Sequence, residues 1–368
     1  MAFDPEKFRD RIAESQRRID IASRFEEPDR VPINISAVGS YYCWLYGCDI
    51  AEYYRDVALQ LEVQLKGQEW AFEELCDDRT GYGLWADLGP LGEGLLWGCA
   101  IERPAGTSPW IVPCVHTPQD IERLPVPDPA TAPGVKWALE RHERMKELAR
   151  ERGIGLGVSG GVSIHPPLSA ACALAPAHLV YEWLYTEPER MRLFFDRLLE
   201  AFFRLTEFND RYFGVKEHRS IGLADDNSAF VSDEMYRELV LPYNRAIYDR
   251  YGQEGRYLHA DGPNDHHFET YANVLKLTRM DIGGFSDIAA AKRALAGKVV
   301  MSGGLNCKDL YGDFEAARPA IERAVRIGAP GGGYIFAIGG ETYPGVRPDT
   351  LIRTVEHVKE IGRYPIAV

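Results

Sequence analysis

The chain contains the stretch Gly255-Arg-Tyr-Leu-His259-Ala-Asp261-Gly262-Pro263, which has the form of a short buried strand followed by a tight turn. The last side chain of this strand is an imidazole, and the turn begins with a carboxylate. In a barrel of parallel strands, catalytic residues lie at the carboxyl ends of the strands. We therefore take His259 and Asp261 as the first candidates for a functional site.

On both sides of this stretch, short β-branched segments alternate with longer segments of helical spacing. We expect strands near residues 30–36, 75–77, 154–159, 220–223, 257–259, 280–283, 298–302 and 333–337. We expect helices near residues 4–23, 49–75, 135–152, 165–210 with breaks at Pro176 and Pro188, 232–251, 265–276, 288–296 and 347–362. Repeated strand–helix units favour parallel pairing with right-handed crossovers.

Eight such strands predict a single α/β domain with the TIM (β/α)8 barrel fold, preceded by an N-terminal helix. An open doubly wound sheet is the alternative, but the chain lacks the G-x-G-x-x-G unit that opens many such sheets. Residues 80–115 are rich in Gly, Trp and Pro and show no helical period. We interpret them as an inserted hairpin or lid within the one domain, 1–368.

Charge and composition exclude several classes of partner. The net charge is −13 and no Lys/Arg-rich run is present, which argues against nucleic acid and anionic membrane surfaces. No apolar run reaches the length of a membrane helix, and the charged first residues do not resemble a secretory signal. The seven cysteines never occur as C-x-x-C, so we expect free thiols in a cytoplasmic protein.

A metal site is the first interpretation of the His-x-Asp turn. Neutral imidazole and carboxylate are both good Zn²⁺ ligands, and a third can come from another strand end, where Glu341 is the best candidate. His259 could instead act in the active site without a metal. It could also bond a neighbouring strand while Asp261 caps the turn.

Other strand ends and loops supply further candidates. Asp225 and Asp226 follow a predicted strand, and either could act as a general base or orient a substrate hydroxyl; a capping role is the alternative. The aromatic run 40–46 follows the first strand and suits the lining of a substrate pocket. The candidate substrate-binding residues are Asn34, Tyr41, Tyr42, Trp44 and Asn306.

The order of these motifs resembles the uroporphyrinogen decarboxylase superfamily. The resemblance lies in the strand end at Asp225-Asp226 with the helix that continues to Leu-Pro242-Tyr, in His259-Ala-Asp-Gly262, in Ser302-Gly-Gly-Leu-Asn306 and in Gly331-Gly-Gly-Tyr-Ile-Phe-Ala. It covers most of the chain, and it implies a TIM barrel.

Two branches of the superfamily differ in their site residues. True decarboxylases have an Arg-Gln-Ala-Gly-Arg segment after the first strand, where this chain has Ser36-Ala-Val-Gly-Ser-Tyr-Tyr without arginine. Corrinoid-linked methyltransferases of the other branch bind zinc through His-x-Cys and a later Cys. This chain keeps the histidine as His259, but has Asp261 in place of the first Cys and Glu341 near the second.

The resemblance therefore implies a methyltransferase with a harder ligand set, which suits an oxygen-bearing substrate such as a methoxy compound. We expect transfer of a methyl group between a small substrate and a corrinoid carried by a partner protein, with zinc at the barrel mouth. A homodimer is a candidate assembly. A metal-free decarboxylase or lyase using His259 as acid and base is the alternative enzyme. A non-catalytic protein that binds a ligand or a corrinoid is the third possibility.

Overall fold

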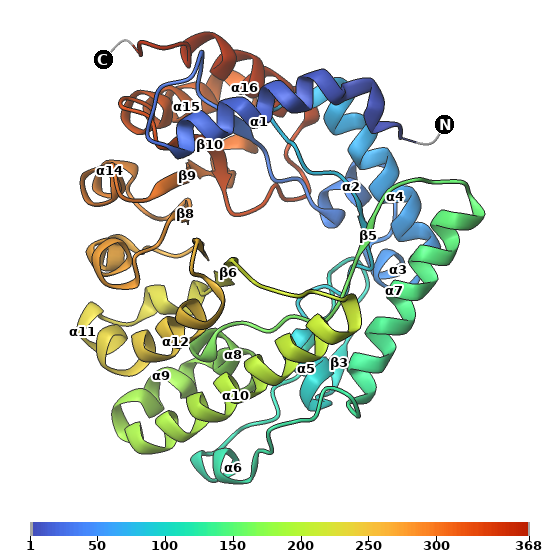
Figure 1. The fold of residues 1–368 in the computed structure, drawn as a ribbon, viewed down its shortest axis with the longest axis vertical. Coiled ribbons are helices and arrows are strands. Elements are labelled where there is room, and N and C mark those ends of the chain that lie inside the picture. The colour runs from blue at the N-terminus through green and yellow to red at the C-terminus, as the bar shows by residue number, and fades with distance from the viewer. Residues whose placement is uncertain (1–2, 367–368) are drawn as a thin grey trace. The chain divides into compact units, whose positions relative to one another are not determined.

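The computed structural model describes residues 3–366, which form two compact units. Unit 1 comprises the chain up to Cys48, Glu62–Tyr82 and the chain from Tyr257 onward. Unit 2 comprises Asp49–Leu61 and Gly83–Arg256. Figure 1 shows the helices and strands of both units.

Unit 1 is built on parallel strands in the order β1-β10-β9-β8-β7. Their central side chains, such as Leu258, Met280, Met301 and Ile335, are almost completely buried. In β9 and β10 consecutive side chains are buried on both faces, and this is why the sequence marks these two strands well. The strands are β1 (Ile33–Asn34), β7 (Gly255–Ala260), β8 (Arg279–Ile282), β9 (Val300–Asn306) and β10 (Tyr334–Gly339).

The helices of unit 1 include α14, α15 and α16, which lie outside strands β8, β9 and β10 (Figure 1). N-terminal caps explain where two of these helices begin. The Asp287 carboxylate accepts hydrogen bonds from backbone N–H groups in the first turn of α14, and the Asp313 carboxylate accepts one from the first turn of α15. The helical elements are η1 (Pro5–Phe8), α1 (Arg9–Ser23), α2 (Gly39–Leu45), the end of α4 (Val57–Trp70), η2 (Ala71–Leu75), η5 (Asp265–His267), α13 (Phe268–Thr270), η6 (Tyr271–Leu275), α14 (Ile288–Leu295), η7 (Cys307–Leu310), α15 (Phe314–Gly328) and α16 (Pro348–Ile361).

Unit 2 is mainly helical. Its strands are β2 (Leu84–Trp85) and β5 (Val158–Ser159), which pair in parallel, the antiparallel hairpin of β3 (Ile101–Glu102) and β4 (Trp110–Ile111), and β6 (Ser220–Ala224). Its helical elements are α3 (Ile50–Arg55), the start of α4, α5 (Gly92–Trp97), α6 (Pro118–Arg123), α7 (Pro133–Glu151), α8 (Pro167–Leu174), α9 (Ala177–Thr186), α10 (Pro188–Phe213), η3 (Asp226–Phe230), α11 (Asp233–Met235), η4 (Tyr236–Val240) and α12 (Leu241–Tyr251).

Most predicted elements are present, and one predicted strand is wrong. The helical region 165–210 breaks into α8, α9 and α10 at the two prolines, as expected. The strand expected at 75–77 is absent, because Cys76 ends η2 in the left-handed conformation (φ 55°) and the carboxylates that follow accept from backbone amides of β1 and its neighbour Ile35. The next strand along the chain is β2, at Leu84–Trp85.

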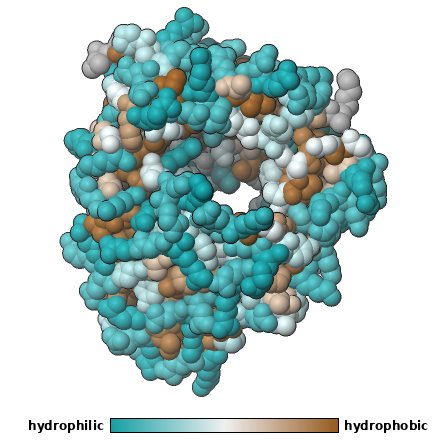
Figure 2. All heavy atoms as spheres, viewed as in Figure 1, coloured by the Kyte–Doolittle hydropathy of each residue, from teal (hydrophilic) through white to brown (hydrophobic). Residues whose placement is uncertain are grey.

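The hairpin expected within residues 80–115 is formed by β3 and β4. Its function as a lid stays a prediction. Hydrophilic residues dominate the face that Figure 2 shows, in keeping with the high content of charged residues. Among the described residues, none of the helices combines the length and the apolar character needed to cross a membrane.

Candidate active site

Strands β7 and β8 of unit 1 place polar side chains in two successive layers. The register pairs His259 with Asp281, and Tyr257 with Arg279. Side chains alternate across a strand, so residues two apart on a strand share a face. One face of this strand pair therefore carries a lower layer of Tyr257 and Arg279, and an upper layer of His259 and Asp281 nearer the carboxyl ends.

Asp281 holds the imidazole of His259. Nδ1 of His259 lies 3.0 Å from Oδ2 of Asp281. A carboxylate can only accept, so Nδ1 carries the proton and donates it; in a neutral ring the lone pair then lies on Nε2. Burial raises the pKa of Asp281, and the hydrogen bond from His259 opposes that rise.

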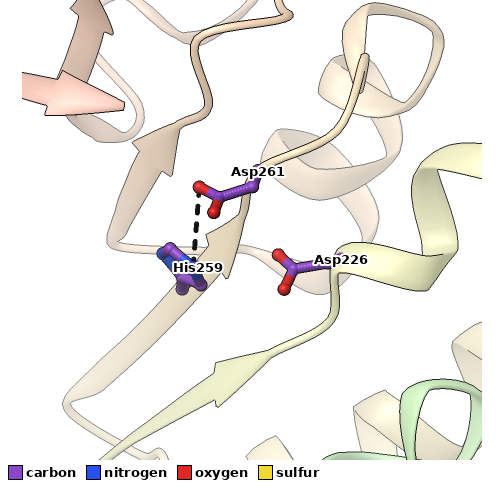
Figure 3. Close-up of side chains that lie close together, drawn as sticks. All are labelled: Asp226, His259 and Asp261. Atoms are coloured by element: carbon purple, nitrogen blue, oxygen red, sulfur yellow. Dashed lines mark ion pairs between the residues drawn. The ribbon is translucent and has the colours of Figure 1, made fainter. Parts of the chain in front are cut away.

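Asp261 follows β7 directly and faces the other ring nitrogen of His259 (Figure 3). Oδ1 of Asp261 lies 3.6 Å from Nε2 of His259, which is too long for a hydrogen bond. The backbone opposite the carboxylate is Gly340, at φ +81°; a Cβ there would lie 2.9 Å from Oδ2 of Asp261. Only glycine leaves the carboxylate this space without strain.

A cavity of about 330 Å³ opens beside these residues within unit 1. It collects side chains from β7 and β8, and also from β1 and from the segment after β10. Its lining residues are Asn34, Ser36, Tyr257, His259, Arg279, Asp281, Ser302, Ala337, Ile338, Gly340 and Glu341. The structure thus brings three of the predicted site residues, Asn34, His259 and Glu341, to one cavity, with Asp261 against His259.

Two donors of this site, on His259 and Asp261, are spaced as neighbouring ligands of a zinc ion. Two ligands at about 2.0–2.1 Å from a tetrahedral zinc lie about 3.3 Å apart, close to the 3.6 Å between Nε2 of His259 and Oδ1 of Asp261. The Asp281–His259 hydrogen bond matches the carboxylate that usually orients a zinc-bound histidine. Glu341 lines the same cavity and is exposed.

In unit 2, Asp225 and Asp226 follow β6 but differ in environment. Asp225 is completely buried; Ser169 donates to its Oδ1 at 2.7 Å and Asn244 to its Oδ2 at 2.8 Å. Asp226 is half-buried and begins η3, at the end of the strand (Figure 3). Asp225 therefore braces the turn, which leaves Asp226 as the better candidate for contact with a substrate.

The buried carboxyl of Asp225 predicts a pH-dependent stability. Burial raises its pKa to about 6, while an unfolded aspartate titrates near 3.9. The native state then binds more protons than the unfolded state between about pH 4 and pH 6. The contribution of Asp225 to the free energy of unfolding should fall over this range as pH rises, by on the order of 3 kcal/mol, and stay level above it.

We expect Asp225→Asn to remove this decline, because an amide does not ionise. Urea unfolding at pH 4, 5, 6 and 7 measures it, with Glu217→Gln, which alters an exposed acid of unit 2, as the control. Parallel pH profiles for Asp225→Asn and the unmodified protein would contradict the prediction.

Sequence reasoning missed a second imidazole–carboxylate pair, in unit 2. Oε1 of Glu93 accepts from the backbone N–H of His165 at 2.6 Å and lies 2.9 Å from its Nδ1. Burial disfavours the charged imidazole, but the hydrogen bond and charge of Glu93 more than offset it, so the pKa of His165 is raised. The two residues lie 72 positions apart, and no local motif links them.

The remaining predicted substrate residues are placed elsewhere. Tyr41 and Tyr42 are buried and pack against Trp70, while Trp44 is partly exposed. Asn306 holds its turn: its side chain donates to Gly284 and accepts from Lys308. Among the residues that the structure describes as lining the 330 Å³ cavity, none of these four occurs, and their contact with substrate stays a prediction.

A cavity at the carboxyl ends of parallel strands, with polar residues drawn from several of them, defines the class of α/β-barrel enzymes. More particularly, the chain belongs to the uroporphyrinogen decarboxylase family, whose family model matches residues 14–361. Its superfamily consists of enzymes.

Known relatives at the level of sequence are distant. The uroporphyrinogen decarboxylase of Azotobacter vinelandii is 25% identical over 299 residues, covering 76% of this chain and 78% of that protein. That of Magnetococcus marinus is 23% identical over 364 residues, covering 93% and 96%. The match to the Thioalkalivibrio sulfidiphilus enzyme is 30% identical over 76 residues, or 21% of this chain and 22% of that protein.

A solved structure confirms the predicted fold. A methyltransferase from Methanosarcina mazei superimposes with a TM-score of 0.67 at 16% sequence identity, over 94% of this chain and 98% of that one. With the family match, this similarity establishes the α/β fold of the TIM-barrel type.

Proposed function

We propose that this chain is a methyltransferase that moves a methyl group between a small methoxylated substrate and a corrinoid carried by a partner protein. The observation that carries the proposal is the placement of His259, whose Nδ1 is held by Asp281 while Nε2 faces Asp261 at 3.6 Å. A pair of nitrogen and oxygen donors arranged in this way suits a zinc ion. We propose Glu341 as the third ligand.

The chemistry of the donors indicates the kind of substrate. Nitrogen and oxygen ligands are harder than the thiolates that would suit a sulfur substrate, and they favour an oxygen-bearing one. Bound zinc supplies a Lewis acid that polarises the ether oxygen and improves the leaving group. The similarity to a structure named as a methyltransferase supports the methyltransferase branch of the superfamily. In addition, residues 36–42 contain no arginine that could hold the carboxylates of a porphyrinogen.

Each residue then has a distinct role. His259 and Asp261 bind the metal, Asp281 holds the imidazole in the tautomer that binds it, and Gly340 leaves room for the Asp261 carboxylate. Strand ends of a TIM barrel serve one catalytic face. On that ground we propose that Asp226, which follows β6, orients the substrate or moves a proton, with Asp225 bracing its turn.

Metal analysis of the unmodified protein is the primary test. We expect about one zinc per chain after purification without chelator, and transfer of a methyl group from a methoxylated compound to a reduced corrinoid. Asp261→Asn should weaken zinc binding by more than about 100-fold in equilibrium dialysis, since even residues that only support a ligand contribute 10–100-fold.

Asp265→Asn is the matched control, because Asp265 begins η5 in the same loop and accepts from the backbone of Asp287. It should bind zinc as the unmodified protein does. A protein that takes up no zinc, or an Asp261→Asn variant that binds it with unchanged affinity, would refute the proposed site.

A metal-free decarboxylase or lyase is the second candidate, and the same hydrogen bond favours it. An imidazole oriented by a buried carboxylate is also the arrangement of a general acid and base. Chelation separates the two functions: turnover that survives complete removal of metal would support the lyase and exclude the metal-dependent transfer.

A further inference from the structure

Arg279 is a cation inside the candidate site that forms no hydrogen bond or ion pair with an acid among the described residues, although its charge opposes the rise that burial causes in the pKa of the nearby Asp281. It begins β8, and its side chain shares the strand face of Asp281, one layer below it. It lines the 330 Å³ cavity and also a neighbouring cavity of about 440 Å³ in the same unit. Asn34 and Ser36 line both cavities as well.

The guanidinium of Arg279 forms no hydrogen bond and no ion pair within residues 3–366. The guanidinium lies over the ring of Tyr257, whose centroid is 5.8 Å from Cζ. Nε of Arg279 is buried without a hydrogen-bond partner among these residues. A desolvated donor left in this way costs free energy that a bound acceptor would recover.

Other arginines of unit 1 show the contrast. Arg79, which lines the 440 Å³ cavity with Arg279, donates from Nε and Nη2 to Asp77 at 2.6 and 2.9 Å. Arg18 and Arg30 each hydrogen-bond to Asp78. These cations are hydrogen-bonded to carboxylates of the protein, whereas Arg279 lines two cavities without such a hydrogen bond among the described residues.

Asp281 and Arg279 line the same cavity, but no hydrogen bond joins them. Its Oδ2 is occupied by His259, and its Oδ1 is buried without a hydrogen-bond partner among the described residues. The acid and the guanidinium thus lie in successive layers without bonding to each other. The space beside them is left to a ligand.

We propose that Arg279 binds the carboxylate of a small organic acid in this cavity. The planar fork of a guanidinium matches a carboxylate, to which it can donate two parallel hydrogen bonds. Asn34 and Ser36 supply neutral polar groups on the same wall. A cavity of about 330 Å³ has the size of a site for a small molecule.

The charges of the cavity disfavour a dianion more than a monoanion. Asp281 and Glu341 line it together with Arg279, the one arginine or lysine among its described lining residues. A phosphate dianion would therefore meet stronger repulsion from the two carboxyl groups than a carboxylate, which brings a single negative charge. The identity of the substrate as a methoxylated carboxylic acid rests on the proposed function; the binding of a carboxylate at Arg279 does not.

Ligand binding to the full chain tests this proposal directly. The probes are 4-methoxybenzoate, its neutral amide 4-methoxybenzamide, and phenyl phosphate, titrated by calorimetry into protein treated with chelator. We expect the benzoate to bind at least about 10-fold more tightly than the amide and than phenyl phosphate. Arg279→Gln should lose at least about 10-fold in affinity for the benzoate alone, and Arg279→Lys should lose less.

Arg326→Gln, which alters an exposed arginine of the same unit, is the control and should bind the benzoate normally. Zinc binding by Arg279→Gln should match that of the unmodified protein, which also shows that the variant is folded. Equal affinity for acid and amide, preference for phenyl phosphate, or unchanged binding by Arg279→Gln would each overturn the proposal. If the benzoate binds but zinc and methyl transfer are absent, the proposed function fails and the carboxylate site stands.

Discussion

His259→Ala is expected to lose both zinc binding and methyl transfer. The substitution removes the imidazole that Asp281 holds in place and that faces Asp261. Removal of a group that acts directly in the chemical step usually lowers turnover by about 10²–10⁴-fold, and here the metal is expected to be lost with it. Methyl transfer to a reduced corrinoid and zinc content per chain are the two measurements.

The same substitution leaves the buried Asp281 without its hydrogen bond, so reduced stability must be separated from lost chemistry. Asp281→Asn serves this purpose, because its amide oxygen can still accept from Nδ1 of His259. We expect it to keep part of the activity, with zinc affinity reduced by about 10–100-fold. Added imidazole should partly restore His259→Ala. Full activity in folded His259→Ala would exclude any role of this residue in catalysis.

The sequence predicts elements well where a strand is long and apolar. Strands β9 and β10 are marked by runs of buried side chains, Val300–Gly303 and Tyr334–Ile338. Strand β2 has only two residues within a glycine-rich segment, so no alternation marks it. The false strand at 75–77 contains two acidic residues whose side chains bond to backbone amides at β1, a tertiary contact that local pattern cannot reveal.

The sequence predicts site residues that end a strand better than it predicts side-chain contacts between neighbouring strands. His259 and Asp261 stand out because they end a strand and begin its turn. The function of Asp281 depends on the register that pairs it with His259 across β7 and β8, which the sequence does not specify. Arg279 had a usable signal, because charged and apolar residues alternate in Arg279-Met-Asp281-Ile, a period-2 pattern that places both charges on one face.

Asp225 and Asp226 illustrate a different limit. They are adjacent in sequence and identical in type, so composition and spacing cannot distinguish them. Burial does: one carboxyl is enclosed by Ser169 and Asn244, while the other is half-buried. Which of two neighbouring acids faces the core is settled by packing partners far away in the chain.

Asp78→Ala is expected to cause the largest loss of stability. This almost completely buried carboxylate, at the end of the segment that follows η2, joins three parts of unit 1. It accepts from Arg18 of α1 at 2.6 Å, from both terminal nitrogens of Arg30 at 2.6 and 2.9 Å, and from the backbone N–H of Ile33 at 2.9 Å. Ser15 donates to it at 3.2 Å.

Removal of one partner from a buried ion pair leaves the opposite charge desolvated and uncompensated, which costs about 3–5 kcal/mol. Here two guanidinium groups lose their shared acceptor, although Arg18 keeps its contact with Asp29. We expect the free energy of unfolding to fall by about that amount in urea denaturation. Asp10→Ala, at a fully exposed acid of the same helix α1, should change it far less.

The double variant Asp78→Leu/Arg18→Met distinguishes lost attraction from stranded charge. If the cost of Asp78→Ala comes from the uncompensated guanidinium groups, removing one of them together with the acid should recover part of the stability. If the network itself supplies the stability, the double variant should be no more stable than Asp78→Ala. A loss below about 1 kcal/mol for Asp78→Ala would contradict both accounts, and would mean that Arg18 and Arg30 find other acceptors or water when the carboxylate is absent.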